Sequence, residues 1–293
     1  MNIEDLLNVL AEIKQKHHNK LYPFIGSWNV HLLKVAGEDF DKVTRLDKLI
    51  RKQLFNWINI RDYDKCNYFA GFHSLANEIG SALRVFTLNY DLCVEKALAK
   101  ENAQVELGFD ENRDWEASNF DADDNSDNSV YLYKLHGSID WIRENEKGQV
   151  LKKCDSPQEN PELIFGTTAK LSSIDPYLFY VHEFRKYSLQ HQLRFIVTVG
   201  YSFGDEYVNR LIGQAMMRNK FVNLLTVFPT FCQSDKDSAN TKLEEERQRV
   251  SRLIDTDESR IIVEDATAKE FFESKSNLTY FDHWRVKDDE DPF

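Results

Sequence analysis

Short β-rich runs alternate with longer amphipathic segments from about residue 84 onward, and this alternation restricts the fold more than any other feature of the chain. Strands that alternate with helices predict a mostly parallel sheet with helices on both faces, because each crossover returns over one face. The sequence therefore predicts an α/β fold. The β-rich runs are residues 85–88, 130–135, 163–165, 195–199, 224–228 and 261–263.

Helix start signals precede several of the amphipathic segments. A polar cap or an S/T-x-x-E capping box accepts hydrogen bonds from the unpaired amides at a helix N-terminus. A proline in the first turn is tolerated there because it has no amide hydrogen to pair. The signals are Asp175-Pro176 before a helix that runs towards Gln192, Asp205 before a helix with Val208, Leu211, Ile212 and Ala215 on its inner face, and two capping boxes, Thr241 with Glu244 and Thr267 with Glu270.

The remaining segments are helical or strongly polar. We expect residues 1–83 to form a helical region, 84–275 the α/β domain and 276–293 a C-terminal tail. Residues 110–128 are rich in Asp, Glu, Asn and Ser, which predicts a solvated surface loop. Two apolar helical faces support the first expectation: Leu6, Leu7, Leu10 and Ile13, and the stripe Leu46, Ile50, Leu54, Trp57 and Ile58.

Charge and composition exclude several classes of protein. The chain has 49 acidic and 37 basic side chains, a formal net charge of −12, which argues against a surface that binds nucleic acid directly. It has neither the apolar run of a membrane span nor the pattern of a signal peptide. The four cysteines, Cys66, Cys93, Cys154 and Cys232, form no C-x-x-C pair. We therefore expect free thiols, no metal site and a cytoplasmic location.

Polar turns follow four of the predicted strands, and three of the turns contain glycine. In an open parallel sheet the carboxyl ends of the strands share one edge, where ligands bind. Glycines permit close backbone approach, and helix N-termini favour anions such as a pyrophosphate. The sequence thus predicts a small-molecule site at this edge. The turns are Asn89-Tyr90-Asp91, His136-Gly137-Ser138, Gly166-Thr167-Thr168 and Gly200-Tyr201-Ser202-Phe203-Gly204-Asp205.

Each turn also has a simpler interpretation. Asparagine is a common turn former, so Asn89 could serve the backbone alone. A single histidine after a strand, such as His136, is often a hydrogen-bonded structural residue. The Gly-x-Ser-x-Gly spacing around Ser202 also matches a hydrolase nucleophile elbow, for which His283 is the only histidine later in the chain.

These turns, in this order, resemble the sirtuin-like superfamily, particularly its bacterial antiphage branch of NAD hydrolases. Thr87-Leu88-Asn89-Tyr90-Asp91 resembles the family's Thr-x-Asn-(Ile/Tyr)-Asp strand end, and the segment 135–141 resembles its catalytic-histidine motif. The segment 199–205 is similar to its late Gly-x-Ser turn, and 262–267 to its closing strand-to-helix turn. The resemblance covers residues 84–275 and implies a Rossmann-like sheet.

The resemblance implies an NAD glycohydrolase that cleaves NAD to nicotinamide and ADP-ribose as an abortive-infection effector. Asn89 would hold the attacking water or a ribose hydroxyl, and His136 would act as the base. Asp91 would help to fix the nicotinamide carboxamide. The full set of implied NAD-binding residues beside this catalytic pair is Thr87, Asp91, Gly137, Gly200, Ser202 and Asp265.

Two parts of the family pattern are missing from this sequence. The four-cysteine zinc module has no counterpart, which counts against a protein deacylase. The opening strand with its Gly-Ala-Gly-x-Ser loop has none either, and Phe24-Ile25-Gly26-Ser27 is the nearest string. The alternatives are therefore a truncated N-terminus, or a catalytically silent binding or scaffold subunit completed by a partner. We expect activation through homo-oligomerisation or a separately encoded ATPase or sensor chain, with the stripe at 46–58 as a candidate interface.

Overall fold

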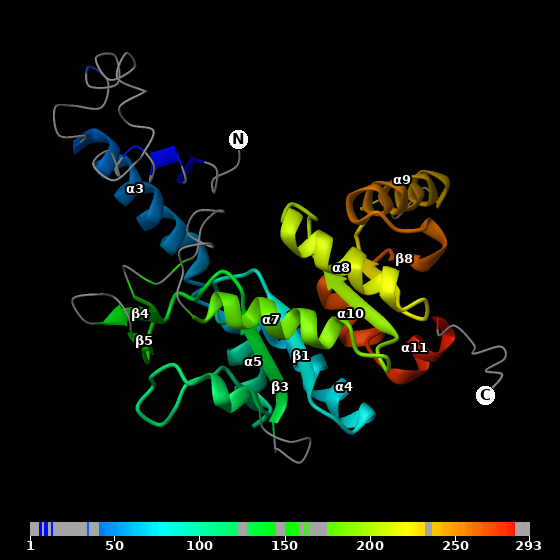
Figure 1. The fold of residues 1–293 in the computed structure, drawn as a ribbon, viewed down its shortest axis with the longest axis horizontal. Helices are drawn as coiled ribbons and strands as arrows, with labels where there is room; N and C mark the ends of the chain where they lie inside the picture. Colours follow the sequence, from blue (N-terminus) through cyan, green and yellow to red (C-terminus); the bar gives the residue numbers. More distant parts are fainter. Residues whose placement is uncertain are drawn as a thin grey trace.

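The core of the protein consists of two three-stranded parallel sheets (Figure 1). One has the order β1-β3-β2, with β1 at Leu83–Thr87, β2 at Gln104–Glu106 and β3 at Asn128–Lys134. The other has the order β6-β7-β8, with β6 at Phe195–Val199, β7 at Asn223–Val227 and β8 at Ile261–Glu264. The computed structural model describes residues 6, 7, 9, 10, 13, 34, 41–121, 128–144, 150–158, 161, 163, 175–231 and 236–284.

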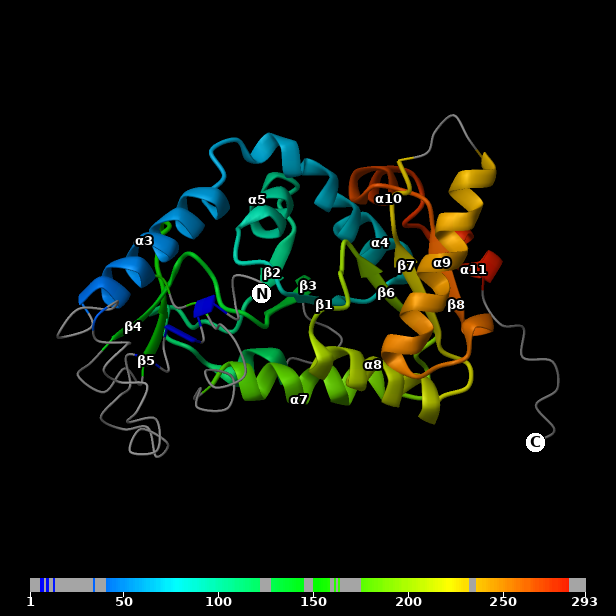
Figure 2. The same ribbon diagram turned by 90° about the horizontal axis from the view of Figure 1, so that it is seen from above.

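The sheets lie side by side, with β1 and β6 on the edges that face each other (Figure 2). In the described part of the chain each of these strands has a paired strand on one side only. Val197 in β6 is 38% exposed, whereas every residue of β7 is buried. The first strand of a Rossmann sheet lies at its centre. The break between β1 and β6 therefore falls at the central position of that order, where the described residues provide no strand.

Helices cover both faces of the sheets. Val130 and Leu132 of β3 pack against the α5 side, while Tyr131 and Tyr133, which alternate with them, pack against Tyr180 of α7. This arrangement confirms the predicted Rossmann-like α/β fold. One face carries α7 (Tyr177–Ser188), α8 (Glu206–Arg218) and α9 (Lys236–Ile254). The other carries η2 (Tyr63–Ala70), α4 (Gly71–Ile79), α5 (Cys93–Lys100), α10 (Ala268–Ser274) and α11 (Leu278–Trp284).

The N-terminal region is mainly helical from residue 41 to 79, as predicted for this part, and α3 spans Asp41–Ile58. Ile50 and Leu54 of α3 pack with Leu7 and Leu10, and this cluster also includes Tyr90 from the turn after β1. The predicted stripe is only partly buried, because Leu46 is 44% and Trp57 is 69% exposed. None of the described helices is long and apolar enough to cross a membrane.

The prediction of a solvated loop at 110–128 is wrong for its first part. Trp115 and Phe120 pack into the aromatic cluster around Tyr180, and Phe120 is 1% exposed. Phe120 belongs to the 3-10 helix η3 (Ala117–Asp121). The abundant polar residues concealed two large aromatic anchors, and burial of such side chains outweighs the polarity of their neighbours. Residues 122–127 lie outside the described part.

Two of the predicted helix caps are also wrong. Thr241 lies inside α9, where its hydroxyl donates to the Asp237 carbonyl at 2.9 Å, so it forms no capping box. Asp175 provides no side-chain cap, because α7 begins at Tyr177 after a cis Asp175-Pro176 bond. α7 also ends at Ser188, short of Gln192. The Thr267 capping box and the Asp205 cap are confirmed.

An antiparallel hairpin follows the turn after β3 and was not predicted. It consists of β4 (Trp141–Glu144) and β5 (Val150–Lys153). Leu163, the one described residue of the predicted strand at 163–165, pairs antiparallel with Gly137 and so does not join the parallel sheet. The predicted turn Gly166-Thr167-Thr168 lies outside the described residues.

Candidate functional site

The turns after β1 and β3 are fixed to each other by backbone hydrogen bonds. The Leu135 amide donates to the Thr87 carbonyl at 3.0 Å, and the Ile139 amide donates to the Tyr90 carbonyl at 3.0 Å. The rings of Tyr90 and His136 have centroids 6.1 Å apart. These contacts bring the predicted Asn89 turn and the predicted His136 turn together at the carboxyl edge of the sheet.

A buried ion pair lies beneath these two turns. Lys134, the last residue of β3, is 1% exposed, and its Nζ lies 2.8 Å from Glu95 Oε1 on α5. The same ammonium donates to the Asp91 carbonyl. Burial raises the pKa of the Glu95 carboxyl, and the charge of Lys134 offsets part of that rise. Lys134 thus holds the turn that follows β1 against the strand that leads to His136.

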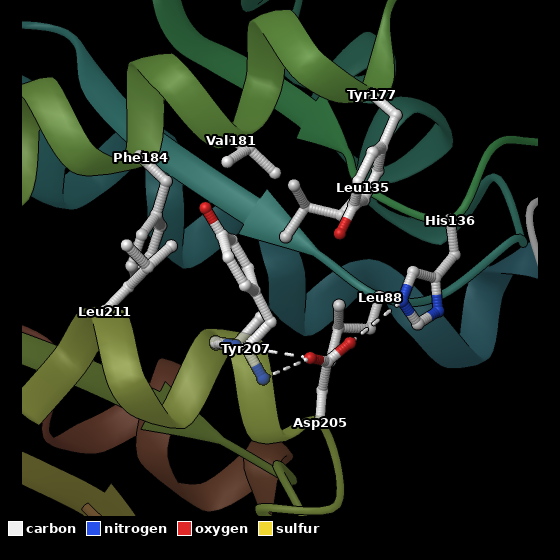
Figure 3. Close-up of a pocket in the computed structure, with 10 residues that line it drawn as sticks. Leu88, Leu135, His136, Tyr177, Val181, Phe184, Asp205, Tyr207 and Leu211 are labelled. Carbon is white, nitrogen blue, oxygen red and sulfur yellow. Dashed lines mark hydrogen bonds and ion pairs between the residues drawn. The ribbon is translucent and has the colours of Figure 1, made fainter. Parts of the chain in front are cut away.

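The turn after β6 brings a carboxylate to His136 (Figure 3). Asp205 is the N-cap of α8: its Oδ1 accepts from the amides of Tyr207 and Val208 at 3.0 and 3.2 Å. Its Oδ2 lies 3.5 Å from His136 Nε2. The side chains of His136 and Asp205 are only 6% and 12% exposed. A protonated imidazole would therefore form a largely desolvated ion pair with a carboxylate that α8 already holds in place.

Side-chain hydrogen bonds hold the backbone of the 200–205 turn to α8. Gly200 has φ 66° and Phe203 has φ 57°, so both residues lie in the left-handed region of backbone conformation. Gly200 adopts this conformation without strain because glycine has no Cβ. The Tyr201 hydroxyl donates to Asn209 Oδ1 at 2.8 Å, and Asn209 Nδ2 donates to the Phe203 carbonyl at 2.9 Å. Asn209 is buried on α8, so the turn and the helix that it begins form one unit.

A pocket between α7 and α8 adjoins the histidine–aspartate pair. The pocket is small and lies partly open to solvent. Burial, followed by the charge of Asp205, raises the pKa of Tyr177 to about 12, so its phenol stays protonated at neutral pH. The pocket is lined by Leu88, Leu135, His136, Tyr177, Val181, Phe184, Asp205, Tyr207, Val208 and Leu211.

The other predicted site residues take different positions at this edge. Asn89 is exposed, and its amide donates to Thr87 Oγ1 at 3.1 Å. Gly137 has φ 86°, and Ser202 is exposed on the 200–205 turn. Asp265 follows β8, which lies two strands away from β6 in the same sheet. Its carboxylate accepts from the Thr230 amide and hydroxyl at 2.9 and 2.8 Å, which ties the turns after β7 and β8 together.

The hydrolase alternative for Ser202 does not match the geometry. Its required histidine, His283, lies on α11 next to Trp284, whose carbonyl accepts from Asn223 at 3.2 Å. Asn223 is the first residue of β7, so this end of α11 lies at the amino edge of the sheet. Ser202 follows the carboxyl end of β6. The two residues are therefore at opposite edges and do not form a triad.

Three residues of the site were missed or only partly understood from the sequence. Asp205 was predicted as a cap but not as the partner of His136. Lys134 carried a signal, because it is a charged residue at the end of an otherwise apolar strand that precedes the histidine. Tyr177 carried none, since its position in the pocket depends on how α7 packs.

Comparison with known families agrees with this geometry. The family described as "SIR2-like domain" matches residues 83–251, more than half of the chain. The matched segment extends from β1 into α9 and so includes His136 and Asp205. No curated protein is significantly similar to the chain. Among the described residues, no group of three or more His, Cys, Asp or Glu side chains is arranged to hold a metal ion.

Proposed function

The chain belongs to the SIR2-like domain family, and from this membership and the geometry of the site we propose that it hydrolyses NAD to nicotinamide and ADP-ribose. Membership is compatible with NAD-related chemistry in general. The observation that carries the specific proposal is the His136–Asp205 pair at 3.5 Å, beside the Asn89 turn at the carboxyl edge of a parallel sheet.

The reaction breaks the bond between the nicotinamide nitrogen and the ribose carbon, and the electron pair leaves with nicotinamide. The oxygen of water forms the new bond to that carbon, and water gives up a proton. The centre passes through an oxocarbenium-like state, as in glycoside hydrolysis. Nicotinamide is already a cationic leaving group, so the protein needs to supply a proton acceptor and an oriented water rather than a strong acid.

The residues of this chain divide those tasks. His136 would accept the proton from water or from a ribose hydroxyl, and Asp205 would stabilise the imidazolium that results. The amide of Asn89 would orient the water. Asp91 would help to bind the nicotinamide carboxamide of the substrate. One of its carboxylate oxygens, Oδ1, already accepts a hydrogen bond from the Cys93 amide at 2.9 Å.

The remaining predicted residues would bind the rest of the substrate. Gly200 and Ser202 lie on the turn that leads into α8, on the side proposed for adenosine. Thr87 and Gly137 shape the two turns that hold Asn89 and His136. Asp265 is already satisfied by Thr230, so any contact with NAD would add to that structural role.

The lining of the pocket bears on activation. Apolar side chains of α7 and α8, such as Val181 and Leu211, line the small space beside His136, so turnover requires α7 and α8 to separate or the substrate to extend over the 200–205 turn. We attribute that opening to assembly, either with a second copy or with an activating chain, in an antiphage response. The exposed part of the α3 stripe, with Leu46 and Trp57, is the surface proposed for it.

A direct assay tests the proposal. Purified protein, alone and at high concentration, is incubated with NAD, and free nicotinamide is measured by chromatography. Turnover that is lost in His136→Ala and in Asn89→Ala supports the hydrolase. Turnover that survives both substitutions contradicts it.

A silent scaffold subunit is the second candidate, and the break between β1 and β6 is the observation that favours it. A scaffold that lacks the site would show no NAD-dependent rise in melting temperature while still forming a defined complex. A hydrolase with an intact site would be stabilised by NAD, because ligands that bind only the folded state raise its stability.

A further inference from the structure

Two cysteines from different elements meet next to the turn that follows β1. Cys66 lies in η2 and Cys93 is the first residue of α5. Their Sγ atoms are 2.8 Å apart, and the residues are 7% and 5% exposed. We infer that Cys66 and Cys93 form an oxidative modification site, at which a small peroxide joins the two thiols in a disulfide.

The geometry favours a bond between these two sulfurs. A disulfide has an S–S length of about 2.05 Å, so the sulfurs have less than about 1 Å to travel. Both thiols are free in the structure, as is Cys154. η2 and α5 pack closely against each other on the same face of the sheet, so neither element has to move far for the bond to form.

The chemistry balances with hydrogen peroxide as the oxidant. One thiol attacks the peroxide and becomes a sulfenic acid, and the first water leaves. The second thiol attacks that sulfur, the S–S bond forms, and the second water leaves. In total the two thiols lose two protons and two electrons, and one peroxide is reduced to two waters. A dithiol reductant reverses the cross-link by thiol–disulfide exchange.

Burial determines how fast the pair reacts. It raises the pKa of the Cys93 thiol well above its ordinary value, and the nearby Asp91 charge acts in the same direction. The thiolate is the reactive form of cysteine. The pair therefore reacts slowly compared with an exposed low-pKa cysteine, and it responds to sustained rather than brief oxidation.

The cross-link would act on the turn that follows β1. The Cys93 amide donates to Asp91 Oδ1 at 2.9 Å, so the cysteine is bonded to the segment that carries Asn89. A disulfide would tie this segment to η2. The cross-link forms whether or not the chain hydrolyses NAD, so its test does not depend on that activity.

Peptide mapping of the wild-type protein tests the modification. The full chain is treated with hydrogen peroxide, catalase removes the excess, and the remaining thiols are alkylated in denaturant before digestion without a reductant. We expect a peptide pair that joins Cys66 to Cys93, lighter by two hydrogens than the two thiol peptides together, and lost after dithiothreitol. The pair should persist in Cys154→Ser and disappear in Cys66→Ser.

Two results would overturn the inference. One is complete alkylation of Cys66 and Cys93 in a sample whose Cys154 has been oxidised by the same treatment. The other is a cross-link from Cys66 to Cys154 or Cys232 in place of Cys93. Because the main measurement uses the wild-type chain, it stands even where a cysteine variant folds poorly.

Discussion

His136 Nε2 lies 3.5 Å from Asp205 Oδ2, although the two residues belong to different halves of the divided sheet. Asp205 reaches the histidine with one carboxylate oxygen while the other caps α8. The position of α8 and the environment of the histidine are therefore coupled through a single side chain. Any motion of α8 away from β3 separates the pair.

Two substitutions at Asp205 separate its two roles. Asp205→Ser keeps a capping oxygen but removes the carboxylate, so stability should change little while NAD turnover falls. Asp205→Ala removes both and should also lower the free energy of unfolding by about 0.5–2 kcal/mol. Chemical denaturation and nicotinamide release measure the two effects. Full activity in a folded Asp205→Ser protein would contradict the role given to the carboxylate.

Removing one partner of the buried Lys134–Glu95 pair should be costly. Lys134→Met leaves the carboxylate of Glu95 without its cation, and breaking such a pair costs about 3–5 kcal/mol. The double variant Lys134→Met/Glu95→Gln should recover a large part of that loss, because no uncompensated charge remains. Urea denaturation of the single and double variants measures it. Equal stability of the single and double variants would contradict the explanation that the loss comes from the uncompensated charge of Glu95.

The two threonines predicted to cap helices should differ in their effect on stability. Thr267→Ala removes the hydroxyl that accepts from the Glu270 amide at 3.2 Å and should cost about 1 kcal/mol. Thr241→Ala, in the interior of α9, should be close to neutral or slightly stabilising, since alanine favours helix interiors. Thermal melting of both variants provides the comparison, and a larger loss in Thr241→Ala would reverse it.

Tyr177 should make part of the protein's stability depend on alkaline pH. Its pKa is raised by burial to about 12 in the folded state, whereas an unfolded tyrosine titrates near 10. The folded state thus holds the proton more tightly, and this contribution is complete below about pH 10. It is lost as pH rises through the folded pKa. Tyr177→Phe should show a smaller loss of stability above pH 10 in urea denaturation, and an identical loss would contradict this.

All of the described parallel strands except β2 were predictable from the sequence, because their β-rich runs are continuous. The strand at Phe195–Val199 matches the prediction at both ends, and β7 and β8 match within one residue. β2 was missed, since three residues, Gln104–Glu106, carry too little pattern. Trp115 and Phe120 were missed because their burial depends on partners distant in sequence, such as Tyr180.

The site was predictable as a set of turns but not as a set of contacts. Strand ends fix which edge Asn89 and His136 share, because a parallel sheet places all carboxyl ends together. The contact between His136 and Asp205 depends on how α8 packs after β6, which local patterns do not specify. The cysteine pair was missed for the same reason, as Cys66 and Cys93 lie 27 positions apart in the chain.

The role of His136 as the proton acceptor in NAD hydrolysis is tested by NAD turnover of the purified chain, with His136→Ala measured beside it. We expect the wild type at high concentration to release nicotinamide and the variant to release none, with both proteins equally folded. Equal nicotinamide release by the two proteins would contradict this role, and so would a wild type that, at high concentration, neither releases nicotinamide nor is stabilised by NAD.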